Sequence, residues 1–311
     1  MIGNFNLPLD KSSAKTFVFT AGSNINTGTV WSGLQRWEKP KGINFVYGMI
    51  IGAASGGGGG GTLGGGGGGT PGGFYTFLQP AFLVPDYLYV SVGKGGAGGT
   101  AGSNGGFPNA TTGLLFDAAS VPGSVAATRI QYMCIPISSG TQSGRGGTSG
   151  AAGAGGTTTT LTNPQPAGVY GFSNVNVLAN TSTGFNGGLT TAGIDATFLG
   201  RPQGGAGGGG RSGGARNGGN VIGPSSSANS IWSRNLSGGA FTGAAGENGI
   251  TLFEPTLFFL PGAGGGANDA GAGGRGGDGG IGCGGGGGGA GSTVGGAGGN
   301  GGDGLIILTC W

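Results

Sequence analysis

The side chains that most often carry out catalysis are scarce in this sequence. The chain has no histidine, three cysteines and ten carboxylates among 311 residues. Enzymes that transfer protons or activate a nucleophile near neutral pH need a histidine or a cluster of ionisable groups. The positions of Asp117, Asp195, Glu247 and Glu254 indicate no such cluster. We therefore predict that the protein is not an enzyme and that it uses no cofactor.

The three cysteines, Cys134, Cys283 and Cys310, follow neither a metal-binding nor a disulfide pattern. No CxxC spacing is present, and an odd number of cysteines cannot all pair within one chain. The opening "MIGNFNLPLDKSSAK" lacks the basic and apolar regions of a signal peptide, and no apolar stretch reaches the ~18 residues of a membrane-spanning helix. We expect reduced thiols, no metal site and synthesis in a cytoplasm without a signal peptide.

Arginine follows or precedes glycine in "GRGG", "GGGGRSGGARNGG" and "GGRGGDGG", which resemble the RGG segments of RNA-binding proteins. The same residues, Arg145, Arg211, Arg216 and Arg275, could instead lie on the outward edges of an ordered structure. We favour the second interpretation, because arginines are few, Asp278 lies close to Arg275 and the net charge is only +3. No nucleic-acid partner is expected.

Glycine supplies 88 of the 311 residues. The backbone elements that position the few reactive or charged side chains must therefore consist largely of glycine. A collagen triple helix is excluded because there is no Gly-X-Y register and only 14 prolines. Disordered chains combine low hydrophobicity with high net charge. This chain has 35% hydrophobic and 7% charged residues, which favours an ordered fold.

Short runs rich in Val, Ile, Phe and Tyr alternate with the glycine runs. No amphipathic helical pattern is present, whereas these runs are typical of β-strands. Most of them lead directly into a glycine run, as "FVYGMIIGA" leads into the glycines from position 56. The predicted strands are 16–21, 43–53, 87–93, 129–137, 256–260 and 305–310.

Within the glycine runs the other residues recur every third position. Examples are Lys94, Ala97, Thr100 and Ser103; Arg145, Thr148, Ala151 and Ala154; Ala206, Ser212 and Ala215; and Ala272, Arg275, Asp278, Ile281 and Ala290. Three residues per turn is the period of the extended left-handed helix, which has no internal hydrogen bonds. Its N–H and C=O groups must find partners in neighbouring helices. Two bare glycine edges permit that close approach, and the third edge can carry an outward side chain.

These patterns predict an all-β or irregular fold. A β-sandwich-like base would carry a bundle of polyglycine II helices with long connecting loops and almost no α-helix. The run "GGGGGGTLGGGGGGTPGG" (56–73) has three bare edges, so we expect 56–61 and 64–69 to lie in the bundle interior. Thr62-Leu63 and Thr70-Pro71 are then expected to be breaks or turns.

Long intervals between the glycine runs, at 72–90, 157–200 and 221–255, mix aromatic residues with Ser, Thr and Asn. This composition is typical of adaptable binding loops. Candidate receptor-binding residues are the aromatic side chains Tyr170, Phe172, Phe185, Trp232 and Phe241. The alternative is that these aromatic rings close small satellite cores beneath the loops.

Two segments resemble a known family. "GTVWSGLQRWEKPKGINFVYGMIIGAASGGGGGG" (28–61) and "GGAGGNGGDGLIILTCW" (295–311) are similar to the opening and closing of phage glycine-rich tail-fibre adhesins, such as the distal adhesins of T-even-like phages. The resemblance implies a polyglycine II sandwich whose loops bind a host receptor. It implies a virion-surface location after synthesis in the host cytoplasm. The partners would be other virion proteins and a protein or glycan receptor, with a homo-oligomer as a further option.

The resemblance also suggests a division of the chain. Residues 1–40 would form an N-terminal attachment segment with the first strands, and 41–311 the glycine-rich domain with loop insertions at 157–200 and 221–255. Other functions stay open. A capsid or fibre decoration protein would not bind a receptor. Flat slabs of glycine helices with small outward residues would also suit an ice-binding protein, and RNA binding is a further alternative. Tail and head locations are both open.

Overall fold

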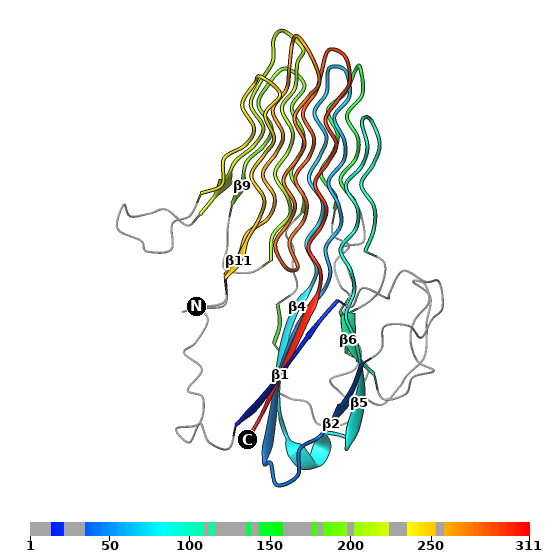
Figure 1. The fold of residues 1–311 in the computed structure, drawn as a ribbon, viewed down its shortest axis with the longest axis vertical. Helices are drawn as coiled ribbons and strands as arrows, with labels where there is room; N and C mark the ends of the chain where they lie inside the picture. Colours follow the sequence, from blue (N-terminus) through cyan, green and yellow to red (C-terminus); the bar gives the residue numbers. More distant parts are fainter. Residues whose placement is uncertain are drawn as a thin grey trace.

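The computed structural model describes residues 14–21, 35–108, 112–115, 135–137, 143–157, 176–178, 183–197, 202–223, 235–252 and 258–311. These residues form a base of β-sheets from which a long bundle of extended segments rises (Figure 1). The described residues contain β-strands and one short 3₁₀ helix but no α-helix. The prediction of an all-β or irregular fold is confirmed.

The larger sheet of the base has the order β1-β13-β3-β4-β8, and every pairing in it is antiparallel. Its strands are β1 (Lys15–Thr20), β13 (Leu305–Cys310), β3 (Phe45–Ile51), β4 (Phe74–Pro80) and β8 (Asn176–Leu178). The C-terminal strand β13 therefore lies between β1 and β3. Gly48 in β3 faces Phe77 in β4, and the missing side chain makes room for the aromatic ring.

The second sheet has the order β2-β5-β6-β7, again antiparallel. Its strands are β2 (Gln35–Glu38), β5 (Tyr87–Ser91), β6 (Thr112–Leu115) and β7 (Ile135–Ile137). The 3₁₀ helix η1 (Ala81–Leu83) joins β4 to β5 at the end of the base remote from the bundle (Figure 1).

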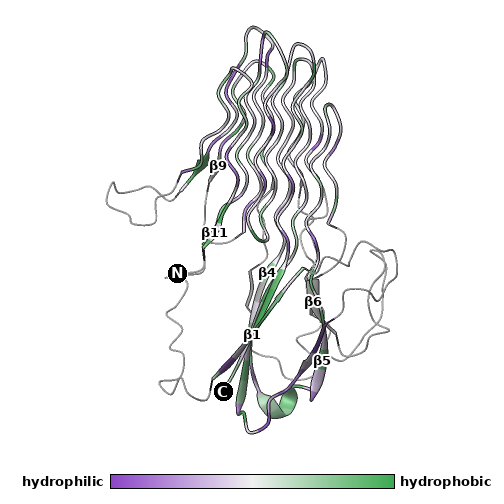
Figure 2. Ribbon diagram, viewed as in Figure 1, coloured by the Kyte–Doolittle hydropathy of each residue, from purple (hydrophilic) through white to green (hydrophobic). Residues whose placement is uncertain are grey.

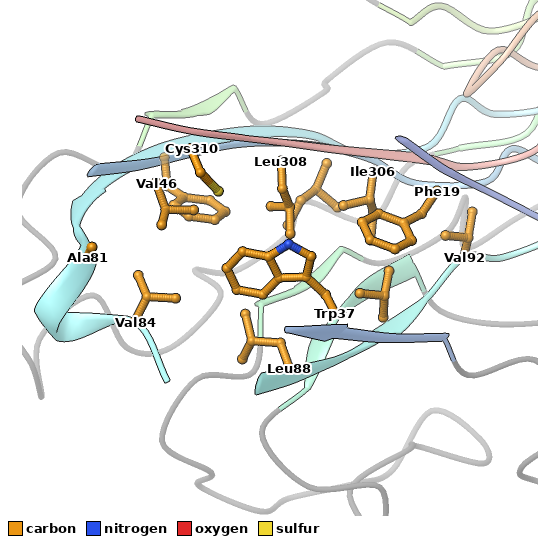
Figure 3. Close-up of a cluster of buried hydrophobic side chains, with 13 residues drawn as sticks. Phe19, Trp37, Val46, Ala81, Val84, Leu88, Val92, Ile306, Leu308 and Cys310 are labelled. Carbon is orange, nitrogen blue, oxygen red and sulfur yellow. The ribbon is translucent and has the colours of Figure 1, made fainter. Parts of the chain in front are cut away.

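The two sheets enclose an apolar core, with Trp37 at its centre (Figure 3). Side chains of β3 alternate between buried and more exposed positions, as expected for a strand with one face in a core. The core residues are Phe19, Trp37, Val46, Ile50, Phe77, Ala81, Val84, Leu88, Val90, Val92, Ile306, Leu308 and Cys310. The base is thus the sandwich that the strand-like runs predicted.

The described residues before position 41 belong to this sandwich. β1 pairs along its whole length with β13, and Trp37 in β2 is 2% exposed. The proposed division at 40/41 therefore cuts through the core instead of separating a domain. Residues 1–13 and 22–34 lie outside the described part.

The bundle consists of extended segments that run to and from the base. Their hydrogen bonds arrange them in four layers. The layers are 94–101, 295–303, 272–280 and 244–250; then 103–107, 54–61, 283–290, 261–267 and 236–240; then 144–148, 64–72, 203–210 and 215–220; and lastly 151–157, 183–188 and 192–197. Figure 2 shows that the bundle is mostly pale, whereas hydrophobic colour marks strands of the base and the short strands near β9 and β11.

Residues 64–69 show how an interior segment is held. Successive N–H groups donate in rotation, at 2.8–2.9 Å, to segments 144–148, 183–188 and 283–290. The carbonyl groups accept, also in rotation, from segments 54–61, 151–157 and 203–210. Each interior segment thus has six neighbours, and the rotation repeats every three residues. This is the hydrogen bonding expected of packed polyglycine II helices.

The close packing explains why glycine is needed. A Cβ built on Gly66 would come closer than 3.0 Å to the carbonyl oxygen of Gly58, which is nearer than real Cβ atoms approach other atoms. Residues 56–60 and 64–69 are buried, and Gly61 is half-buried. The predicted interior position of the two hexaglycine runs is confirmed, as is the turn at Thr62-Leu63.

Several details of the three-residue pattern were wrong. Ala206 and Ala290 were expected on outward edges but are fully buried, because their segments are interior ones. Ala206 packs in a second apolar cluster, where the neighbouring segments carry apolar side chains. Thr70-Pro71 is not a turn: Thr70 stays in its segment, and its hydroxyl lies 2.8 Å from that of Ser55.

Two small sheets close the lower side of the bundle (Figure 1). β9 (Ala196–Thr197) pairs in parallel with β10 (Val221–Ile222), and β11 (Thr251–Leu252) pairs antiparallel with β12 (Phe258–Phe259). The second apolar cluster lies here and consists of Ala196, Ala206, Val221, Leu236, Phe258, Leu260 and Ala263.

Candidate functional site

The bundle ends, away from the base, in a set of short turns (Figure 1). We call this end the distal face. In the described part of the chain its turns are at 62–64, 101–103, 149–150, 189–191, 212–214, 241–243, 269–271 and 292–293. Three of them contain glycines with positive φ, namely Gly102, Gly213, Gly214 and Gly243, a conformation that favours glycine. Each pair of neighbouring segments is thus joined tightly, so the turns protrude little.

The side chains of the distal face are mostly short and hydroxylated. Exposed residues of this kind are Thr62, Thr100, Ser103, Thr148, Ser149, Thr190, Thr191, Thr242 and Thr293. Larger apolar side chains stand among them: Phe241 is 58% exposed and Val294 is 48% exposed. An aromatic ring among hydroxyl groups can both stack on a ligand and leave polar groups free to hydrogen-bond to it.

Charged side chains tie neighbouring turns together. Arg211 lies 3.8 Å from Asp269, and its Nε donates to the carbonyl oxygen of Thr62 at 2.9 Å. Asp269 Oδ2 in turn accepts from the N–H of Ala215 at 2.7 Å. Because Asp269 is largely exposed, we assign the pair a small energy. Its effect is to fix three turns of the distal face relative to one another.

The structure places two of the five candidate aromatic residues. Phe241 stands exposed in the 241–243 turn of the distal face. Phe185 is half-buried and packs against the second apolar cluster, which agrees with the satellite-core alternative. Tyr170, Phe172 and Trp232 lie outside the described residues, so their role stays a prediction.

The long intervals are less loop-like than the sequence suggested. Residues 183–197 and 235–252 form four further segments of the bundle, with turns on the distal face. The interval 72–90 forms β4, η1 and β5 of the base. Ser, Thr and Asn are typical of loops, but on an outer segment they can also occupy the outward edge. Residues 158–175, 179–182, 198–201, 224–234 and 253–257 are outside the described part.

On the sides of the bundle, Asn and Asp side chains repeatedly link one segment to the backbone of the next. In each case the side-chain Oδ1 accepts a backbone N–H of an adjacent segment, while the N–H of the next residue donates to a carbonyl of that same segment. We call this pair of hydrogen bonds the Asx clamp. It occurs at Asn104, Asn186, Asp195, Asn217, Asn220, Asn235, Asn248, Asp278, Asn300 and Asp303.

The clamp follows a geometric rule. Between antiparallel segments the two backbone groups that it uses are two residues apart: Asn104 accepts from Gly146, and Gly105 donates to Gly144. Between parallel segments they belong to one residue: Asp278 accepts from the N–H of Asn300, and Gly279 donates to the carbonyl of Asn300. The sequence signal for the clamp is an Asn or Asp on the outward edge of an extended segment.

Two cysteines and two of the carboxylates named from the sequence lie in the described residues. Cys283 and Cys310 are free and buried, and burial raises the pKa of their thiols to about 12 and about 11. Asp195 and Glu247 each accept a backbone N–H. No group of three or more His, Cys, Asp or Glu side chains in the described part could hold a metal ion. Nor is any helix found there that is long and apolar enough to cross a membrane.

No protein-family model matches the sequence, and no curated protein matches it either. The choice of the distal face as the candidate site rests on the geometry and chemistry of its own residues.

Proposed function

We propose that this protein is a phage virion protein that acts as a host-receptor-binding adhesin on a tail fibre or another appendage, with the distal face as its binding surface. One observation carries the proposal: the chain returns to the same end of a rigid bundle again and again, and each return presents a turn there.

The interior of the bundle supports this assignment. Its glycine positions have no room for a Cβ, so side chains can change there only at the cost of the packing. Some turn positions are freer: a Cβ built on Gly150 meets no atom within 4 Å, whereas turn glycines such as Gly243 stay restricted. A scaffold of this kind can present different recognition residues at its distal face while the body stays the same.

The rigidity of the turns also suits recognition. Short turns that are held by neighbouring segments, by the Arg211–Asp269 pair and by the bond from Arg211 to Thr62 lose little freedom when a ligand binds. Phe241 offers an apolar anchor on this surface, and aromatic anchors often carry much of the binding energy of an interface. The base at the opposite end is left to attach the protein to other virion proteins.

The test is adsorption of particles that carry the Phe241→Ala variant. We expect slower adsorption to host cells with unchanged particle assembly. Phe107→Ala is a matched control, because Phe107 is also 58% exposed but lies away from the distal turns. If both variants adsorb as fast as the parent, Phe241 is not part of the binding surface. If adsorption also stays unchanged after substitution of Thr62, Thr190 and Thr242, the result favours a decoration protein.

The other functions have weaker support. RNA binding through arginine needs guanidinium groups that are open to phosphates and bases, yet Arg211 and Arg275 face Asp269 and Asp278. Ice binding needs a broad flat surface of small residues, whereas Asx clamps and ion pairs occupy much of the bundle's sides. Both arguments leave the adhesin and the decoration protein as the two candidates for the adsorption test.

A further inference from the structure

The chain contains five Asn-Gly pairs, and all of them lie in Asx clamps. They begin at Asn104, Asn186, Asn217, Asn248 and Asn300. Asn-Gly is the dipeptide in which asparagine deamidates most readily, because the following glycine has no side chain to hinder attack. Each of these easily deamidated pairs is therefore held by the same pair of hydrogen bonds.

Deamidation of Asn-Gly begins with attack of the glycine backbone nitrogen on the side-chain Cγ. A bond forms between this nitrogen and Cγ, the bond from Cγ to Nδ2 breaks, and ammonia leaves with the proton that the attacking nitrogen gives up. Water then opens the cyclic imide to aspartate or isoaspartate. The reaction needs a free glycine N–H and a carboxamide that can turn back onto its own backbone.

The clamp denies both requirements. In each of the five pairs the glycine N–H donates to a carbonyl of the adjacent segment, at 2.6–2.9 Å. The asparagine Oδ1 is held at 2.8–3.0 Å by a backbone N–H of that segment. The carboxamide and the glycine N–H are thus both held against the adjacent segment, and both hydrogen bonds must break before the imide can form.

We propose that the Asx clamps protect these five Asn-Gly pairs, so that they become modification sites only when the sides of the bundle open. Once a pair has reacted, isoaspartate adds a methylene to the main chain. The added atom shifts the three-residue register and prevents the clamp from closing again. Modification at these positions would thus record past opening of the bundle. The chemistry is the same whether or not the protein is an adhesin.

The experiment compares deamidation rates at each pair by peptide mass mapping after incubation at mildly alkaline pH. The Ser149→Asn variant supplies the control inside the same molecule, because it creates an Asn-Gly pair in an exposed turn. There the N–H of Gly150 donates to the Thr148 hydroxyl of its own turn. We expect the pair at 149–150 to deamidate at the rate of the unfolded chain and the five clamped pairs at least about tenfold more slowly, a factor that corresponds to about 1.4 kcal/mol.

Denaturant should abolish the difference between the clamped pairs and the control. If the Ser149→Asn variant does not fold, the unsubstituted protein in native buffer and in denaturant gives the same comparison. Equal rates at the five pairs in the folded and unfolded protein would overturn the proposal. The proposal would also be wrong if the control pair at 149–150 deamidated as slowly as the clamped pairs. The glycine-rich surroundings, and not the clamp, would then be protective.

Discussion

The side-chain oxygen of Asn186 accepts the backbone N–H of Gly155 at 2.8 Å, although the two residues lie in different segments of the bundle. The next residue, Gly187, donates to the carbonyl of Gly153 in the same neighbouring segment. An outer polyglycine segment has the problem of an edge β-strand, because one row of its backbone groups has no neighbour. The Asx clamp supplies some of these backbone N–H groups with an acceptor, the side-chain oxygen of an Asn or Asp in the adjacent segment.

Removal of one clamp should weaken the bundle measurably. We expect Asn186→Ala to lower the free energy of unfolding by about 1 kcal/mol, because a part-buried N–H loses its acceptor. Asn186→Asp is the matched control: it keeps an oxygen acceptor and should stay closer to the parent. Denaturant unfolding midpoints measure the difference, and an alanine variant as stable as the parent would show that the clamp adds no stability.

A single methyl group in the bundle interior should be far more damaging. For Gly66→Ala we expect a loss of roughly 4 kcal/mol or more, or failure to fold, because the new Cβ would overlap the carbonyl of Gly58. Gly150→Ala is the control, since its Cβ would meet no atom within 4 Å. Soluble yield and thermal unfolding report the outcome. A Gly66→Ala protein with the parent's midpoint is incompatible with the packing described above.

The base offers a paired test of its core. Gly48→Ala should destabilise the protein by about 1–3 kcal/mol, because the Cβ would collide with the ring of Phe77. Adding Phe77→Leu should recover part of that loss, since the smaller side chain leaves room. Unfolding free energies of the two single variants and the double variant give the coupling. Simple additivity would mean that the two residues do not share the space between β3 and β4.

Alkaline pH should destabilise the protein through its buried thiols and phenol. Burial raises the pKa of Cys283 to about 12 from 9.0, and it raises the pKa values of Cys310 and Tyr47 to about 11 and about 12. The neutral forms are thus favoured in the folded protein. Their stabilisation is complete below pH 9 and declines as the pH rises through 9 toward 12.

Unfolding midpoints across this pH range measure the decline. The Cys283→Ala variant should lose less stability between neutral pH and pH 11 than the parent does, whatever its stability at neutral pH. An identical pH dependence in both proteins would show that the Cys283 thiol does not contribute.

Much of the architecture could be predicted from local sequence, because a period of three residues specifies the polyglycine II conformation directly. Lys94, Ala97 and Thr100 are exposed as that period requires. The layer that a segment occupies is a tertiary property, so Ala206 has the same local pattern but is buried. Clamp partners are equally invisible locally: Asn300 accepts from Gly98, about two hundred residues earlier.

The candidate site was predictable only in part. Phe241 was identified from its aromatic ring in a polar stretch, and the structure exposes it on the distal face. Phe185 had the same signal but packs against an apolar cluster, because the segments beside it carry apolar side chains at that level. The gathering of all these turns at one end follows from the directions of the segments, which no single stretch of sequence specifies.

The most direct test of the account is site-specific photo-cross-linking from particles that are adsorbed to host cells. A photoreactive group at Thr242, on the distal face, should cross-link to a molecule of the host surface. The same group at Lys41, exposed in the base, should cross-link only to virion proteins. A host molecule captured from Lys41, or none from the distal turns while adsorption proceeds, would contradict the claim that the distal face binds the receptor.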